Sequence, residues 1–159
     1  MKKTVFFVLC AITFLSCNQN TVYETHESNF PDYRWAKEKT INFNPIIEDD
    51  TTACDVYLAL RHVAGFQHPA MKVSVERTAP SGETSKKDYS MKVIGDDGQY
   101  ISDCAGDYCD LEVLIEDDVI FKEKGQYKYV VSQTMDGEYV PNVMEFGLII
   151  KKNENKENN

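Results

Sequence analysis

Apolar and polar residues alternate with a period of two along most of the chain after about residue 40. In residues 71–77, Met71, Val73 and Val75 share one face, and charged or hydroxyl residues separate them. Such alternation is typical of strands that bury one face. No stretch of ten or more residues shows the 3.6-residue period of an amphipathic helix. About eight short strands separated by polar turns are therefore expected.

The predicted strands are defined by the residues that share an apolar face. These faces are Ile41 and Phe43; Cys54, Val56, Leu58 and Leu60; Met71, Val73 and Val75; Tyr89, Met91 and Val93; Leu111, Val113 and Ile115; residues 119–121; Tyr127, Tyr129, Val131 and Gln133; and Phe146, Leu148 and Ile150. Residues 78–87 are expected to form a surface loop, and acidic turns are expected at 48–50, 95–98 and 116–118. This pattern predicts an all-β, single antiparallel β-sandwich or jelly-roll-like domain, with an open antiparallel barrel as the alternative.

The first twenty residues have a different pattern, in which two lysines precede an apolar run over residues 5–15. The run is too short for a transmembrane helix, which needs about 20 residues. Since Ser16 and Cys17 follow it, residues 1–16 are predicted to be a lipoprotein signal peptide, and Cys17 is predicted to carry the lipid. The alternatives are an ordinary signal peptide cut near Ser16 and an uncleaved segment.

Cleavage before Cys17 would leave a lipidated N-terminus and tether at residues 17–29, the β-domain at 30–152 and a disordered tail at 153–159. Loss of Lys2 and Lys3 would change the net charge from −9 to −11. This negative charge argues against nucleic acid or anionic lipid as a direct partner. Membrane attachment is therefore expected through the lipid on Cys17.

Three further cysteines are expected to have structural roles. Cys104 and Cys109 are separated by four residues that include a glycine, which allows a disulfide in an oxidising compartment. A pair of free thiols is the alternative. Cys54 lies on the apolar face of its predicted strand and is expected to be a small buried residue.

No arrangement of residues predicts catalysis, a metal or a cofactor. His26, His62 and His68 do not belong to an HExxH motif, and the chain has no nucleophile elbow or glycine-rich phosphate loop. The acidic turns lack the alternating spacing of a calcium loop. Trp35, the single tryptophan, is interpreted as a packing residue rather than a residue that stacks on a ligand.

Several short segments resemble one known family in their order and spacing after the signal peptide. They are Tyr33-Arg34-Trp35, residues 43–49, Tyr57-Leu58-Ala59-Leu60-Arg61-His62, residues 125–136 with Gly125, Tyr127, Tyr129 and Gln133, and Phe146-Gly147-Leu148-Ile149-Ile150-Lys151. The chain thereby resembles the GldH family of gliding motility lipoproteins of the Bacteroidetes. It differs from the usual pattern of that family at Ala70-Met71, at Asp136 and in the cysteine pair.

The resemblance implies a membrane-anchored, non-enzymatic accessory of the gliding motility and type IX secretion machinery. Its partners would be envelope proteins of that machinery, and its lipid would lie in the outer membrane, with the leaflet left open. Trp35, Arg61 and His62 are the candidate interaction residues. The alternative is an envelope lipoprotein with a glycan- or ligand-binding jelly-roll module, which would be favoured if Trp35, Tyr57 and Tyr100 formed an exposed platform.

Overall fold

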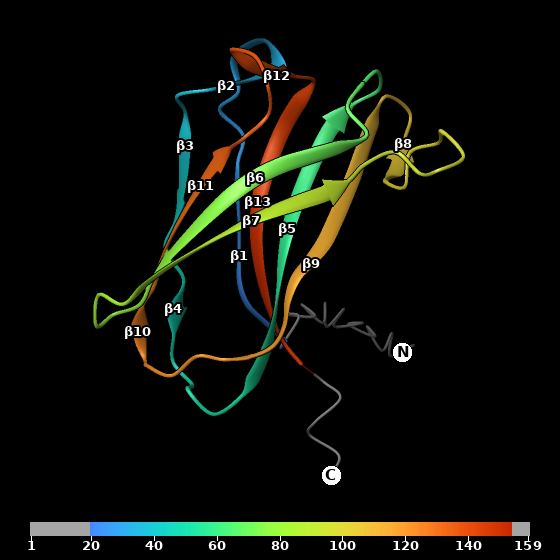
Figure 1. The fold of residues 1–159 in the computed structure, drawn as a ribbon. Helices are drawn as coiled ribbons and strands as arrows, with labels where there is room; N and C mark the ends of the chain where they lie inside the picture. The colour runs from blue at the N-terminus through green and yellow to red at the C-terminus, as the bar shows by residue number, and fades with distance from the viewer. Residues whose placement is uncertain (1–19, 154–159) are drawn as a thin grey trace, which may run out of the picture.

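The computed structural model describes residues 20–153, which form two antiparallel β-sheets packed face to face (Figure 1). The larger sheet contains, in spatial order, β1 (Thr21–Glu27), β13 (Val143–Lys152), β5 (Ala53–Val63), β9 (Tyr108–Ile120) and β8 (Asp103–Ala105). The smaller sheet contains β3 (Thr40–Phe43), β11 (Lys128–Gln133), β6 (Ala70–Thr78) and β7 (Thr84–Lys92).

Two short ribbons complete the fold at opposite ends of the sandwich. They are β2 (Arg34–Ala36) with β12 (Tyr139–Pro141), and β4 (Ile46–Ile47) with β10 (Gly125–Gln126). A single 3₁₀ turn, η1 (Pro31–Tyr33), precedes β2, and residues 20–153 contain no α-helix.

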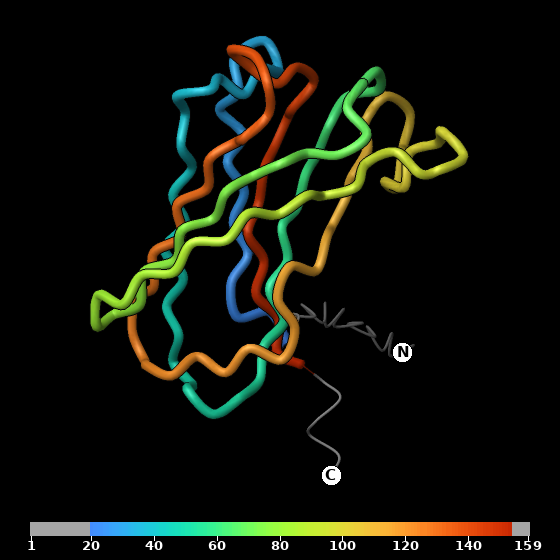
Figure 2. Tube along the Cα trace, viewed as in Figure 1, coloured from blue at the N-terminus to red at the C-terminus, as the bar shows by residue number. Residues whose placement is uncertain are grey.

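The two sheets remain separate, which confirms the predicted sandwich. The larger sheet ends at β1 and β8, and the smaller one ends at β3 and β7. Because neither pair of edges joins through a strand ladder, the structure is not a closed barrel. The trace in Figure 2 shows the chain passing between the two layers by loops at both ends.

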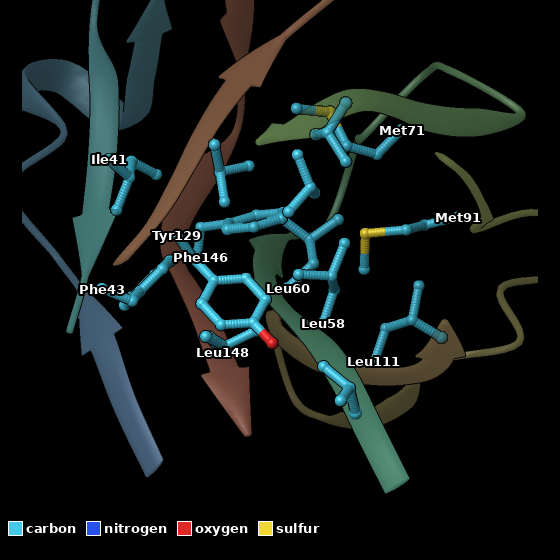
Figure 3. Packing of buried hydrophobic residues seen from close by; sticks show 14 of the residues in the cluster. Ile41, Phe43, Leu58, Leu60, Met71, Met91, Leu111, Tyr129, Phe146 and Leu148 are labelled. Carbon is cyan, nitrogen blue, oxygen red and sulfur yellow. The ribbon is translucent and has the colours of Figure 1, made fainter. Parts of the chain in front are cut away.

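The core lies between the sheets and is built from the predicted apolar faces (Figure 3). Leu58 and Leu60 of β5 lie opposite Leu148 and Phe146 of β13, and all four side chains are buried. Tyr129 of the other sheet is buried against this layer. Since burying one such side chain contributes about 1.5–3 kcal/mol, these alternating faces determine which side of each strand points inward.

The predicted tether is wrong over residues 21–27, which form the edge strand β1. Six residues of β1 pair with β13, from Thr21 opposite Lys151 to Glu27 opposite Phe146. Val22 and Tyr23 are packed against the core, so the segment gains both a strand ladder and apolar contacts. The folded domain therefore begins at Thr21 rather than at residue 30.

The folded domain also extends slightly past its predicted C-terminal boundary at residue 152, because the backbone N–H of Asn153 donates to the carbonyl of Ala53. Residues 1–19 and 154–159 lie outside the described part of the chain. The predicted signal peptide, Cys17 and most of the predicted tail therefore fall outside the structure.

Two predicted loops are partly strands. β7 begins at Thr84, within the segment expected to be a loop over residues 78–87. β9 continues through the expected acidic turn at 116–118, with a change of register in its pairing to β5 and a left-handed Asp118 at φ 52°. In both places the side chains are mostly exposed, so their polarity resembles that of a loop although the backbone is paired.

Candidate functional site

Arg61 is the one candidate interaction residue whose side chain reaches the surface, on the outer face of the larger sheet. It forms two hydrogen bonds with Asp110, from Nε to Oδ1 at 2.7 Å and from Nη2 to Oδ2 at 3.1 Å. Its Nη1 also donates to Glu145 at 3.4 Å. The hydrogen bonds from Arg61 to Asp110 raise the pKa of the guanidinium further, so Arg61 stays charged.

The surroundings of Arg61 form a shallow groove of about 440 Å³ across β1, β13, β5 and β9. Its lining includes Glu24, His26, Ala59 and Glu112, in addition to Arg61 and its two carboxylates. These charged residues give the groove more negative than positive charge. Ala59 lies opposite Gly147 in the strand ladder, so two small residues form the centre of this face.

Gly147 has a specific reason to be glycine. A Cβ atom at this position would lie 2.5 Å from Nδ1 of His26 on the neighbouring strand. The imidazole therefore lies against the backbone of β13.

His62 lies on the opposite face of β5 from Arg61 and is fully buried. Its Nδ1 lies 3.1 Å from the carbonyl of Val63, and its Nε2 lies 2.9 Å from the hydroxyl of Ser102. The Nδ1 atom donates, which leaves Nε2 to accept from Ser102. Burial lowers the pKa of His62, which favours the neutral ring. This histidine connects β5 to the loop before β8 and is not a surface contact.

Trp35 is also fully buried, as the packing interpretation expects. Its ring packs against Phe30 and Phe146, with centroids 5.6 Å and 4.8 Å away. The indole Nε1 donates to the carbonyl of Lys39 at 2.9 Å. Trp35 therefore anchors the segment after β1 in the core, and it is not available for a ligand or partner.

The three aromatic residues that would have indicated a glycan platform lie apart. Trp35 is in the core, and Tyr57 lies on the outer face beneath the ammonium of Lys151, 4.8 Å from its ring centroid. Tyr100 packs its ring against His62 and donates its hydroxyl to the carbonyl of Phe66. The observation that would have favoured the glycan-binding alternative is therefore not met.

Cys104 and Cys109 face each other across the β8–β9 hairpin and are joined by a disulfide. Gly106 supplies the left-handed backbone of the turn, at φ 66°. Cys54 is a free, buried cysteine, and burial raises the pKa of its thiol. Neither arrangement presents a reactive thiolate.

Glu116 forms a polar cluster that the sequence did not reveal. Its carboxylate accepts from Lys87 at 2.6 Å, from Arg77 at 2.9 Å and from the hydroxyl of Tyr89 at 2.9 Å. These partners come from β6 and β7, whereas Glu116 is on β9, so the cluster bridges the two sheets. Burial alone would raise the pKa of Glu116, but hydrogen bonds and charge from Lys87 and Arg77 outweigh it and lower that pKa.

Between residues 20 and 153, no group of three His, Cys, Asp or Glu side chains is placed to hold a metal ion. No helix in the same part of the chain is long and apolar enough to cross a membrane.

The chain was compared with known proteins. The family model for GldH lipoprotein matches residues 21–150. A gliding motility lipoprotein GldH homolog from Christiangramia forsetii is 24% identical over 156 residues, which covers 94% of each chain. The gliding motility lipoprotein GldH of Flavobacterium johnsoniae is 23% identical over 135 residues, covering 85% of this chain and 82% of the relative.

Solved structures are similar only at a low level. The VP2 subviral particle of infectious bursal disease virus has a TM-score of 0.42 and 13% identity, covering 96% of this chain and 38% of that chain. The CBM35 domain from Cellvibrio japonicus has a TM-score of 0.31 and 13% identity, covering 84% of this chain and 90% of that domain.

The fold is an antiparallel β-sandwich, and the family model that matches it defines a class of lipoproteins. Because the family model matches most of the described residues, the chain belongs to the GldH lipoprotein family of gliding motility.

Proposed function

We propose that this protein is a lipid-anchored accessory of the gliding motility and type IX secretion machinery, held at the outer membrane by a lipid on Cys17. The observation that carries the proposal is the match to the GldH lipoprotein family over residues 21–150. β1 begins four residues after Cys17, so the lipid would hold the folded domain close to the membrane surface. Several acyl chains on one residue would anchor it firmly without a basic surface.

In this proposal, envelope proteins of the machinery bind the outer face of the larger sheet around Arg61. The support is its geometry: Asp110 and Glu145 hold the guanidinium in place in a groove that is lined by further carboxylates. The excess of carboxylates favours a partner with basic side chains, because opposite charges speed association and fix orientation. Side chains that are already ordered also lose little entropy on binding.

The anchor is tested by comparing the native protein with Cys17→Ala in cell fractions, with Cys54→Ala as a control that changes a buried cysteine. Native protein and Cys54→Ala are expected in the membrane fraction, and Cys17→Ala in the soluble fraction. Mass spectrometry of the mature N-terminus should show acyl groups on Cys17. An unmodified N-terminus, or membrane retention of Cys17→Ala, would contradict the proposed anchor.

The partners are tested by crosslinking in cells, affinity purification and quantitative proteomics. Recovery of motility or secretion components is expected with native protein and with Lys92→Gln, a control whose exposed ion pair joins the end of β7 to Asp96. Recovery should fall with Arg61→Gln although the lipid is still present. Recovery of no such component, together with binding on a glycan array, would replace this proposal with the glycan-binding alternative.

A further inference from the structure

The ribbon formed by β2 and β12 lies at the end of the sandwich opposite the start of β1 (Figure 1). β1 starts at Thr21 beside Lys151 and ends at Glu27 beside Phe146, so it crosses the larger sheet from one end toward the other. The chain then enters η1 and β2 immediately. Cys17 precedes the near end of β1, and the ribbon follows its far end.

The turn η1, directly before this ribbon, holds two residues with left-handed backbone in succession. Asp32 has φ 54° and Tyr33 has φ 55°, and neither is a glycine. Left-handed backbone at such residues persists only where the surroundings impose it, and it is concentrated at functional surfaces. Here the surroundings fix the backbone on both sides, because Phe30 before these residues and Trp35 after them are buried and their rings pack together.

This geometry turns Tyr33 and Arg34 outward between two buried anchors. Tyr33 is 47% exposed, and Tyr139 on the paired strand is 42% exposed. The guanidinium of Arg34 lies over the ring of Tyr139, 4.8 Å from its centroid. Tyrosine and arginine are the residue types that carry much of the binding energy at protein interfaces. We call Tyr33, Arg34 and Tyr139 the distal patch.

Arg34 differs from the two other arginines of the chain. Arg61 is bound by Asp110 and Glu145, and Arg77 is bound by Glu116. Among residues 20–153, no carboxylate forms an ion pair with Arg34, and its side chain contacts the face of Tyr139 instead. Stacking orients the planar guanidinium, and its N–H groups remain directed at its edge for a planar anion such as a carboxylate.

A shallow groove of about 570 Å³ adjoins the patch and gives a partner space beside Arg34. Pro31, Ala36 and Tyr139 contribute its apolar surface, which suits an aliphatic side chain. Glu38 and Glu138 also line this groove, but neither carboxylate forms an ion pair with Arg34.

We propose that the distal patch binds an acidic segment of a partner protein, in which a Glu or Asp carboxylate accepts hydrogen bonds from Arg34 and a neighbouring aliphatic side chain fills the groove beside Tyr139. This inference rests on the proposed function, because it assumes that the lipoprotein acts by binding other proteins. It adds a second contact surface, of opposite charge preference to the groove at Arg61 and far from the anchor.

The test uses native protein purified from cells in detergent, and synthetic peptides that place Glu between Leu and Pro, each paired with an analogue in which Gln replaces the Glu. The Glu peptides are expected to bind native protein at least about tenfold more tightly than the Gln analogues, because a charge-assisted bidentate contact is lost. Arg34→Gln should weaken binding of the Glu peptides by a similar factor and leave binding of the Gln analogues unchanged. Tyr139→Ala should weaken both.

The control is Lys92→Gln, which removes an exposed positive charge outside both proposed binding surfaces and should keep the native preference. Equal binding of Glu and Gln peptides, or equal loss with Lys92→Gln, would overturn the proposal. Binding of the protein to a glycan array in a way that depends on Tyr139 would also overturn the proposal. Peptide binding and membrane fractionation are separate measurements. A failed anchor with intact Arg34-dependent binding would contradict the proposed anchor alone. An intact anchor without Arg34-dependent binding would contradict the distal patch alone.

Discussion

The cluster around Glu116 allows a sharp test of how the two sheets are held together. Glu116→Gln keeps the shape of the side chain but removes the negative charge that faces Arg77 and Lys87. The position is suited to the test because the Glu116 side chain is only 13% exposed, so water replaces little of the lost interaction. The substitution should weaken the bridge between β9 and the smaller sheet.

The expected loss of unfolding free energy in Glu116→Gln follows from the exposure of the two cations that Glu116 binds. Lys87 is 57% exposed, and a pair of that kind contributes at most about 1 kcal/mol. Arg77 is 27% exposed, and a hydrogen bond between charged groups contributes about 1.5–3 kcal/mol. The amide of the variant can still accept one hydrogen bond, so the expected loss in unfolding free energy is about 2 kcal/mol. At about 4 °C for each kcal/mol, the melting temperature should fall by about 8 °C.

The matched control is Glu112→Gln on the same strand. Glu112 also binds a lysine, Lys151, at 2.8 Å, but it is 48% exposed. Its loss should therefore cost less than about 0.5 kcal/mol. Both variants are compared with native protein by urea unfolding at neutral pH, followed by far-UV circular dichroism.

The same experiment at lower pH tests the electrostatic origin of the effect. The pKa of Glu116 is lowered from its ordinary value of 4.5, against the effect of burial, by Lys87 and Arg77. A carboxylate of this kind stabilises the fold above the unfolded pKa, and that stability is lost as the pH falls through the folded pKa. The difference between native protein and Glu116→Gln should therefore shrink below about pH 4.5.

Two outcomes would refute this reasoning. If Glu116→Gln were no less stable than Glu112→Gln, the cluster would contribute nothing beyond an exposed ion pair. If the difference stayed constant into acid, the loss would come from packing or amide geometry rather than from the charge.

Three further predictions concern other contacts. Trp35→Ala should lower the unfolding free energy by about 3–5 kcal/mol in urea, and Trp35→Phe by clearly less, because it leaves a smaller cavity. Replacing Cys104 and Cys109 together by serine should cost at most about 2 kcal/mol, since the disulfide closes a short loop, and adding reductant to native protein should reproduce the loss. Gly147→Ala should displace the His26 ring at a cost below about 1 kcal/mol, and His26→Ala in the same chain should remove that cost, as measured by thermal unfolding.

The alternation of apolar residues predicted the central strands because these strands bury one full face. β5 and β13 each place three or more aliphatic or aromatic side chains in the core at every second position. β1 was missed because its apolar residues, Val22 and Tyr23, are adjacent and the rest of the strand is polar. An edge strand needs only one partner, and that partner, β13, lies more than a hundred residues away in the sequence.

The site was less predictable than the fold for a related reason. Arg61 was singled out through the family resemblance, but its partners Asp110 and Glu145 depend on the register of β5 with two other strands. The apolar alternation indicates which face of each strand is buried, but it does not by itself identify which residues of two strands lie opposite each other. Arg61 and His62 are neighbours in the sequence, and the pleat sends one side chain outward and the other into the core.

The segment Tyr33-Arg34-Trp35 shows why packing and binding must be tested separately in this protein. Trp35 is buried between two phenylalanine rings, whereas the residue before it stacks on an exposed tyrosine. A loss of motility in Trp35→Ala would therefore report on folding and say nothing of a partner. Arg34→Gln removes only an exposed stacking contact and leaves the core unchanged, so its melting temperature should stay within about 1 °C of native, as expected for an exposed substitution of less than about 0.5 kcal/mol. If Arg34→Gln melted as far below native as Trp35→Ala, the whole segment would be a packing element and the distal patch would lose its separate role.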